Sequence, residues 1–445
     1  MNARGEFSSR LGFILAAAGS AVGLGNIWGF PTQVASNGGA AFVLVYIVLA
    51  FLLAYPVLMA ELIIGRATRA NMVDALGQIS GSKLGRATGV WGFITVSLIL
   101  AFYAIVAGWM LAFFLETVTH FFALDTLSNW LTSQSIFRNL VFSGAFLILT
   151  AAIVTGGVSK GIERWSVRLM PTLMIIIVLL IGYVSLQDGA IEGWKAYLVP
   201  DFSRIMDPGL LINAMGQAFF SMSLGVGTML VYGSYVSKNE RLPSLGASVA
   251  LVDIGVAVLA GMLIIPSMYV ALHNGVQIFS ESGALIEGDS LIFTVLPALF
   301  DTMGSVGIFV AFAFFALMVI AALTSSISML EVPVAYVVES KGVKRTKAVW
   351  LLAICVFVAS SIIIFNFSSL FGLVISLTTK YSQPLLGLAL CIFAGWVWRR
   401  DHILTELRKG DEEVEHSLFW KIWPWYVKFV CPVVIFIMFY RSVTG

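Results

Sequence analysis

Charge is what this sequence lacks most clearly. Aspartate, glutamate, lysine and arginine make up 11% of the 445 residues, against about 25% in an ordinary soluble domain. Hydrophobic residues make up 59%. A chain of this composition carries too little charge to cover a surface that faces water, so we expect an integral membrane protein.

Signals of redox chemistry and catalysis are also scarce. The three cysteines, Cys355, Cys391 and Cys431, lie in apolar segments without metal-ligand spacing, which argues against a disulfide framework. Four histidines are present, and the chain has neither a glycine-rich phosphate loop followed by lysine nor a Gly-x-Ser-x-Gly motif. We therefore expect neither an enzyme nor an ATP-driven pump. The net charge of +2, without a basic arm, gives no reason to expect a nucleic-acid partner.

Long apolar runs dominate the rest of the chain. A bilayer core of about 30 Å takes about 20 helical residues, and eleven segments fit this requirement. They predict an all-α integral membrane fold with eleven transmembrane helices. The predicted spans are 11–36, 40–65, 88–119, 138–156, 166–186, 209–235, 243–273, 304–338, 347–366, 369–398 and 420–440.

The loops between these spans differ in charge. With the N-terminus placed in the cytoplasm, the basic residues of 4–10, 66–86, 160–168, 341–347 and 399–421 fall on one side, and the opposite loops are acidic or nearly uncharged. Because cytoplasmic loops retain Lys and Arg, we expect a cytoplasmic N-terminus in the inner (plasma) membrane. No small-residue cleavage site ends the first span, so we expect it to stay on the mature protein.

Two predicted helices contain helix-breaking sequences. The first lies at 19–31 and includes Gly23-Leu24-Gly25-Asn26, and the second lies at 219–227 in the sixth span. Irregular backbone in a membrane is tolerated only where it lines a cavity or binds something. A lone Gly-x-Gly is explained as well by close helix packing. Two breaks five helices apart are instead typical of a transporter built from two inverted repeats.

The chemistry of such breaks suits a zwitterion. Amides at the N-terminus of a half-helix attract a carboxylate, and carbonyls freed at a C-terminus bind sodium or an ammonium group. The two breaks therefore predict a site in which the backbone itself binds the solute.

The first break resembles the opening of the neurotransmitter:sodium symporters, and the likeness extends over nearly the whole chain. The matching motifs are Ser9-Arg10-Leu11-Gly12, Gly23-Leu24-Gly25-Asn26-Ile27-Trp28-x-Phe30-Pro31, Asn37-Gly38-Gly39-Ala40-Ala41-Phe42, Pro56, Glu61 through Gly65-Arg66, the break at 219–227, and Leu323-Thr324-Ser325-Ser326. The resemblance implies the LeuT-like fold, a 5+5 inverted repeat with helices 1 and 6 broken. Its parts would be an N-terminal segment (1–10), a first repeat (11–186), an extracellular loop (187–208), a second repeat (209–398), a cytoplasmic loop (399–419) and an eleventh helix with the C-terminus (420–445).

The same resemblance implies two sodium sites. Sodium site 1 would use Ala21, Asn26, Ser221 and Asp253, completed by the substrate carboxylate. Sodium site 2 would use the carbonyls of Gly19, Val22 and Ala321 and the hydroxyls of Thr324 and Ser325.

Several of these residues can be understood more simply when the resemblance is set aside. Asp253 can cap the cytoplasmic end of its helix, and Thr324 and Ser325 can bond to carbonyls four residues back. Glu61 and Glu331, two further acids in membrane spans, are expected to bond to the backbone of the broken helices. If Asp253 instead gives site 1 a fixed negative charge, we expect uptake without a chloride requirement.

For the substrate, the resemblance places the carboxylate on the amides of Leu24 and Gly25 and on the Tyr103 hydroxyl, and the amino group on oxygens of Ala21, Phe220 and Ser223. Tyr103 can equally bond to a neighbouring helix. The substrate side chain would lie among Ile99, Val226, Ser326 and Met329, next to Ser325 and under Phe220. This lining is mostly apolar and predicts a neutral, hydrophobic amino acid.

The implied gates differ on the two sides. Arg4 and Glu339 match an inner ion pair, with Tyr235 nearby, although two unrelated solvated charges account for them as well. The outer pair is missing, because Gly29 and Ser368 stand at the positions aligned with its two charges. Outer closure would then depend on packing by Tyr103 and Phe220. Lys380, inside the tenth span, has no predicted partner and is a functional candidate.

Together these features predict sodium-coupled symport by alternating access, in a monomer or homodimer. A transporter of another small organic solute and a solute sensor on the same fold remain alternatives. An ion channel fits less well, because a channel needs a continuous polar path.

Overall fold

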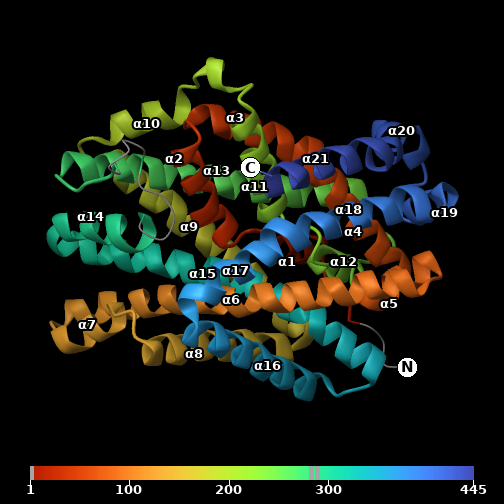
Figure 1. Cartoon of the computed structure of the whole chain (residues 1–445), viewed down its shortest axis with the longest axis horizontal. Coiled ribbons are helices and arrows are strands. Elements are labelled where there is room, and N and C mark those ends of the chain that lie inside the picture. The colour runs from red at the N-terminus through yellow and green to blue at the C-terminus, as the bar shows by residue number, and fades with distance from the viewer. Residues whose placement is uncertain (1–4, 280–284, 286–290, 445) are drawn as a thin grey trace.

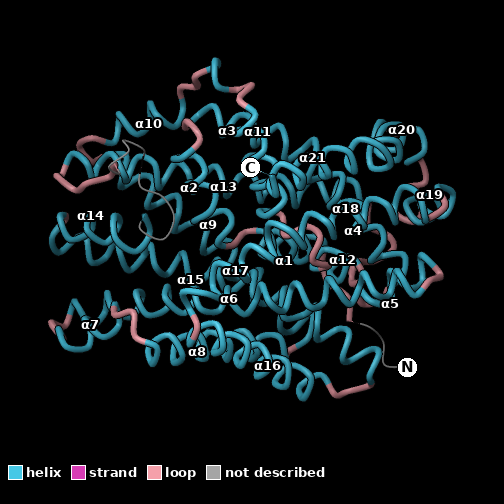
Figure 2. Tube along the Cα trace, viewed as in Figure 1, coloured by secondary structure: helices cyan, strands magenta, loops and turns pink. Residues whose placement is uncertain are grey.

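The computed structural model describes residues 5–279, 285 and 291–444, and these form helices joined by short loops (Figure 2). The α-helices are α1 (Arg10–Ala21), α2 (Phe30–Ser36), α3 (Ala40–Leu49), α4 (Tyr55–Thr68), α5 (Met72–Ser80), α6 (Lys83–Phe121), α7 (Asp125–Thr132), α8 (Ile136–Thr155), α9 (Arg164–Ser185), α10 (Ala190–Leu198), α11 (Pro208–Ser221), α12 (Thr228–Gly233), α13 (Leu242–His273), α14 (Leu296–Thr302), α15 (Gly304–Lys341), α16 (Arg345–Phe365), α17 (Phe367–Ile375), α18 (Gln383–Ile392), α19 (Arg400–Arg408), α20 (Leu418–Trp425) and α21 (Cys431–Thr444).

Shorter π and 3-10 turns extend or connect these helices. The π segments are η1 (Gly25–Gly29), η2 (Ala50–Ala54), η3 (Val158–Glu163), η5 (Leu291–Val295), η6 (Ser376–Ser382), η7 (Phe393–Val397) and η9 (Tyr426–Val430), and the 3-10 segments are η4 (Phe202–Arg204) and η8 (Val414–His416). Because several π segments continue directly into α-helices, the spans around them are longer than any single α label indicates.

Eight continuous helices among the described residues are long and apolar enough to cross a membrane. Two further spans pass this test only as bent pairs: residues 10–21 with 25–36, and 367–397 with 400–408. The predicted span 209–235 falls on α11 and α12, of 14 and 6 residues, which are each too short to cross alone. The all-helical membrane fold is confirmed, and the count of eleven spans stays a prediction.

The first predicted break is present at Val22–Leu24. Val22 has an extended backbone (φ −71°, ψ 101°), and the helices on either side of the break are bent by 54°. The amides that lose helical partners are satisfied locally: Gly23 N–H donates to Asn26 Oδ1 (3.4 Å) and Leu24 N–H to the Tyr103 hydroxyl (3.3 Å). The break is therefore a built feature, whose polar groups are paired inside the protein as a membrane requires.

The second break separates α11 from α12. Its loop holds Ser223, Gly225 and Gly227 in left-handed backbone conformations (φ +51°, +83° and +81°). A Cβ on Gly225 would lie 2.4 Å from the Gln383 carbonyl oxygen, so glycine permits a close approach of α18 to the break. The Glu61 carboxylate accepts from Gly225 N–H (2.7 Å) and Leu230 N–H (3.1 Å), which confirms its expected bond to broken-helix backbone.

The broken helices lie in the middle of the molecule. The two longest helices, α6 and α15, pack along each other through its centre, and α1 packs on α9, α13 and α15. Figure 1 shows α5, α19 and α20 at one end of the long axis and α7, α10 and α14 at the other. This places the breaks about midway between the two ends, where a solute crossing the membrane would have to pass.

Candidate functional site

Five oxygens from α1 and α15 meet beside the first break. Ser325 Oγ donates to the carbonyls of Gly19 (3.3 Å) and Val22 (3.1 Å). Thr324 Oγ1 lies 3.4 Å from the Val22 carbonyl and 3.0 Å from the Ala321 carbonyl. The residues predicted for sodium site 2 are therefore brought together. Both hydroxyls reach across to α1, and that of Thr324 also bonds back along its own helix.

A second polar cluster lies on the other side of the break. Asn26 Nδ2 donates to Asp253 Oδ1 (2.8 Å) and to the Asp253 carbonyl (3.0 Å), and Ser221 Oγ donates to Asp253 Oδ2 (2.9 Å). Tyr46, which sequence reasoning missed, adds a hydroxyl 3.2 Å from Ser221 Oγ. Asn26, Ser221 and Asp253, predicted for sodium site 1, thus meet in one buried cluster, and Ala21 lies nearby at the end of α1.

Asp253 does not cap its helix. α13 begins at Leu242, so Asp253 lies within the helix, fully buried, and the alternative of a capping role is wrong. No described Lys, Arg or His forms an ion pair with its carboxylate. A buried carboxylate with neutral partners is electrostatically suited to receive a cation.

A small cavity lies at the first break. It is about 30 Å³ in volume, enough for a water molecule, which needs about 10–15 Å³, but too small for an amino acid. The lining residues are Ala21, Gly23, Leu24, Gly25, Ile99, Tyr103, Phe220, Ser223, Val226, Ser325, Met329 and Gln383. All predicted substrate residues except Ser326 line it.

Ser326 was predicted to line the substrate pocket, and that prediction is wrong. It is fully buried and faces α8, where its hydroxyl lies 2.8 Å from that of Thr150. Because neighbouring residues on a helix point in different directions, Ser325 faces the first break while Ser326 faces away.

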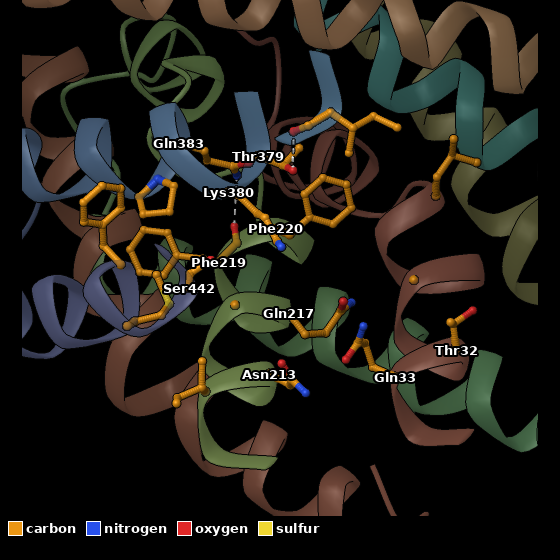
Figure 3. A pocket seen from close by; sticks show the side chains of 18 of the residues that line it. Thr32, Gln33, Asn213, Gln217, Phe219, Phe220, Thr379, Lys380, Gln383 and Ser442 are labelled. Carbon is orange, nitrogen blue, oxygen red and sulfur yellow. Dashed lines mark hydrogen bonds between the residues drawn. The ribbon is translucent and has the colours of Figure 1, made fainter. Parts of the chain in front are cut away.

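A larger cavity of about 650 Å³ adjoins the small one (Figure 3). Leu24, Tyr103, Phe220 and Gln383 line both cavities and so form the boundary between them. Phe220 ring atoms lie 3.1 Å from where a Cβ on Gly25 would be, so the ring packs directly on the first break. Closure of the outer side by Tyr103 and Phe220 stays a prediction.

The lining of the 650 Å³ cavity contradicts the alignment of span 10. Gly29 lines it together with Ile375 and Thr379, whereas Ser368 is exposed in the first turn of α17, away from its lining. Lys380 does line the cavity, and Figure 3 shows its side chain pointing inward beside Phe220. Among the described residues it has no ion-pair partner, so it is a cation that faces the cavity.

On the opposite side, Tyr235 and Glu339 line a third cavity of about 1390 Å³. Arg4, the predicted partner of Glu339, lies outside the described residues. Glu339 accepts from the backbone N–H of Asn71 (2.9 Å) and from its Nδ2 (3.1 Å). The inner ion pair stays a prediction.

Tyr235 belongs to a buried network that the sequence did not indicate. Its hydroxyl donates to Glu331 Oε1 (2.8 Å), and Arg345 pairs with the same carboxylate (2.5 Å to Oε2). Arg345 also donates to the Val154 carbonyl (2.8 Å). The expectation that Glu331 bonds to broken-helix backbone is therefore wrong, because its partners come from α16 and from the loop after α12.

Two glutamines that contact the first break or the small cavity were also missed. Gln217 Nε2 donates to the Gly25 carbonyl (2.7 Å), which supplies a partner for the broken helix. Gln383 Nε2 donates to the Phe219 carbonyl (3.4 Å), and Gln383 Oε1 has no partner within the described chain. The only sign of their role in the sequence is that both are polar side chains in apolar spans.

The described site is that of a transporter: two oxygen clusters and a small cavity at paired helix breaks, with larger cavities on both sides. The model of the sodium:neurotransmitter symporter family matches residues 4–143 and 140–445, and the chain belongs to that family. This family match and the structural similarity to MhsT described next confirm the predicted LeuT-like fold.

The relatives agree with this assignment. The sodium-dependent transporter YhdH of Bacillus subtilis is 34% identical over 98% of this chain and 96% of its own length. A sodium-dependent transporter of Haemophilus influenzae is 32% identical over 98% and 97%. The crystal structure of MhsT in complex with L-phenylalanine has a TM-score of 0.84 and 35% identity over 99% of this chain and all of that one. This chain is accordingly a sodium-dependent membrane transporter of a small solute, as predicted, rather than an enzyme.

Proposed function

We propose that this protein imports a neutral, hydrophobic amino acid together with sodium by alternating access. The observation that carries the proposal is that two oxygen clusters and a small, mostly apolar cavity gather at the first break. Sodium is a hard cation that takes oxygen ligands, and the amides of the break, which lack helical partners, suit a carboxylate. Support for an amino acid comes from MhsT, which was crystallised with L-phenylalanine.

In this proposal, sodium site 2 uses the five oxygens of Gly19, Val22, Ala321, Thr324 and Ser325. The two hydroxyls now donate to carbonyls of the same cluster. All five oxygens would coordinate sodium, with the hydroxyl hydrogens pointing away from the ion.

Sodium site 1 uses the carbonyl of Ala21 and the side chains of Asn26, Ser221 and Asp253. The substrate carboxylate completes the site and also meets the Leu24 and Gly25 amides. This position is now taken by the Tyr103 hydroxyl, which accepts from Leu24 N–H. The substrate carboxylate would therefore replace the Tyr103 hydroxyl as acceptor for Leu24 N–H. The Tyr103 hydroxyl would then donate to that carboxylate.

The proposed side-chain pocket is formed by Ile99, Val226 and Met329, with Phe220 as its cover. None of the residues that line the small cavity is charged, so a charged side chain would have no counter-ion there. Chloride is not required, because the Asp253 carboxylate supplies a fixed negative charge. Arg4 and Glu339 close the inner pathway, with the N-terminus in the cytoplasm.

The direct test of the solute class is a thermal-shift screen of the purified chain. Neutral amino acids, amines and organic acids are compared in sodium and in potassium, since a ligand that binds only the folded state raises the unfolding temperature. Neutral hydrophobic amino acids should stabilise the protein in sodium alone. Stabilisation by amines or organic acids instead would reject the amino-acid assignment.

A further inference from the structure

A separate cavity lies at the end of spans 10 and 11 that is predicted to face the cytoplasm. It has a volume of about 360 Å³ and is lined by residues of η7, α19, α20 and η9. Figure 1 shows α19 and α20 together at one end of the molecule, away from the broken helices. The solute site therefore does not account for this cavity.

Three cations line this cavity: Arg399, Arg400 and Lys428. No Asp or Glu lines it, and none of the three forms an ion pair among the described residues. Asp401, in the first turn of α19, is exposed and does not line the cavity. Cations gathered without a carboxylate favour a ligand that brings negative charge.

Aromatic rings surround these cations. The lining includes Trp396, Trp398, Trp423 and Trp425. Lys428 Nζ lies 4.5 Å from the centre of the Trp396 ring. Tryptophan is enriched where a membrane helix meets the headgroup layer, because its ring is apolar and its N–H is polar.

The walls of the cavity are held together before any ligand binds. Trp396 Nε1 donates to the Lys428 carbonyl (2.9 Å), which joins the ends of spans 10 and 11. A Cβ on Gly395 would lie 2.7 Å from Lys428 Cα, so only glycine allows this approach. The cavity is therefore a preformed feature of the packing between two spans.

Its position fits the surface of a membrane. α19 is bent by 97° from the helix of residues 367–397, so when that helix crosses the bilayer, α19 runs along the bilayer surface. Ile392, Phe429 and Val433 of the same two spans are exposed apolar side chains. They offer an apolar surface for acyl chains next to the cationic cavity.

We propose that this cavity binds the headgroup of an anionic phospholipid, such as phosphatidylglycerol. Arg399, Arg400 and Lys428 contact the phosphate, the tryptophans pack around the glycerol, and the acyl chains follow the exposed apolar side chains. Basic pockets between transmembrane helices recognise anionic headgroups in this way. A zwitterionic lipid binds less well, because its ammonium group meets the same three cations.

The test is lipid binding to the full chain purified in detergent, measured by native mass spectrometry and by the unfolding temperature. Phosphatidylglycerol and phosphatidylcholine with identical acyl chains are compared. Wild type should retain phosphatidylglycerol and gain thermal stability from it. The variant R399Q/R400Q/K428Q should lose at least about tenfold in apparent affinity, since each basic residue near an anionic headgroup contributes severalfold.

The matched control removes three exposed lysines that do not line the cavity, as K160Q/K347Q/K421Q, and should bind like wild type. Size exclusion and circular dichroism verify that both variants are folded. G395A, which pushes the walls apart without a change in charge, should also weaken binding.

Three results would overturn the proposal. The first is equal retention of both lipids by wild type. The second is an equal loss of phosphatidylglycerol binding in the lysine control, which would mean that the general surface charge and not this cavity attracts the lipid. The third is equal stabilisation by soluble glycerol phosphate, which would mean that a free phosphate and not a lipid is the ligand.

Discussion

At the scale of single residues, Asp253 decides the electrostatics of the site. It is fully buried, accepts hydrogen bonds from Asn26 and Ser221, and has no cationic partner among the described side chains. A charge in this setting is costly unless a cation arrives, and the proposed function supplies sodium.

The variant D253N should raise the sodium concentration for half-maximal uptake by about tenfold or more, because ligand charge tunes the affinity of an oxygen site for a cation. Asp207, which caps the exposed start of α11, supplies the control D207N, and it should leave the sodium curve in place. An unchanged curve for D253N would remove Asp253 from the sodium site.

The hydroxyls of Thr324 and Ser325 allow a second test at this scale. The double variant T324V/S325A removes two of the five proposed sodium ligands and should raise the sodium concentration needed for half-maximal uptake. A loss of about 1.4 kcal/mol in sodium binding already lowers the affinity tenfold. The neighbouring S326A removes a hydroxyl that faces α8 and serves as control. If both variants shift the sodium curve equally, the effect comes from packing and not from ligation.

At the scale of helices, the fold depends on how the breaks are held. Glu61 reaches from α4 to the second break and accepts from the amide of Gly225 in the loop and from that of Leu230 in α12. Hydrogen bonds to a charged group contribute about 1.5–3 kcal/mol each, so this one side chain fixes the second break.

The variant E61Q should lower the unfolding temperature in detergent by several degrees, because the amide offers one acceptor oxygen where the carboxylate offers two. E192Q, on the exposed α10, should have almost no effect. Equal unfolding temperatures for the two variants would show that the Glu61 bonds do not stabilise the second break.

The network of Tyr235, Glu331 and Arg345 ties the inner ends of α15 and α16 to the loop after α12. Removing one partner of a buried pair leaves the other charge without compensation, at about 3–5 kcal/mol. We expect the single variants E331Q and R345Q each to lower the unfolding temperature strongly. The double variant E331Q/R345Q should lower it by less than the sum of the two single losses. Additive losses in unfolding temperature would show that the two charges do not interact.

The helices also show where the sequence was informative. The breaks at 22–24 and 222–227 could be predicted because two glycine-rich runs, five spans apart, interrupt helices that are otherwise continuous and apolar. Most of the cavity lining followed from the same motifs. Ser326 and Ser368 were misplaced because motif spacing does not determine which face of a helix a residue occupies. The Glu331–Arg345 pair joins two spans across a turn, and no local pattern indicates such a partner.

At the scale of the whole molecule, two large cavities lie on opposite sides of the small one. Gly216, with open space around it, lines the 650 Å³ cavity, which is predicted to face outward. Gln78 lines the 1390 Å³ cavity, which is predicted to face the cytoplasm. In a background with Cys355, Cys391 and Cys431 replaced, G216C should react with a membrane-impermeant thiol reagent from outside intact cells. Q78C should react only after the membrane is opened. The reverse pattern would invert the predicted orientation.

The central claim is coupled transport, and uptake into proteoliposomes tests it most directly. The purified chain is reconstituted, and the labelled amino acid that stabilises it is supplied under an inward sodium gradient. The account predicts accumulation above the outside concentration, abolished when sodium is equal on both sides or replaced by potassium, and unchanged when gluconate replaces chloride. Binding without accumulation, or accumulation indifferent to the sodium gradient, would contradict it.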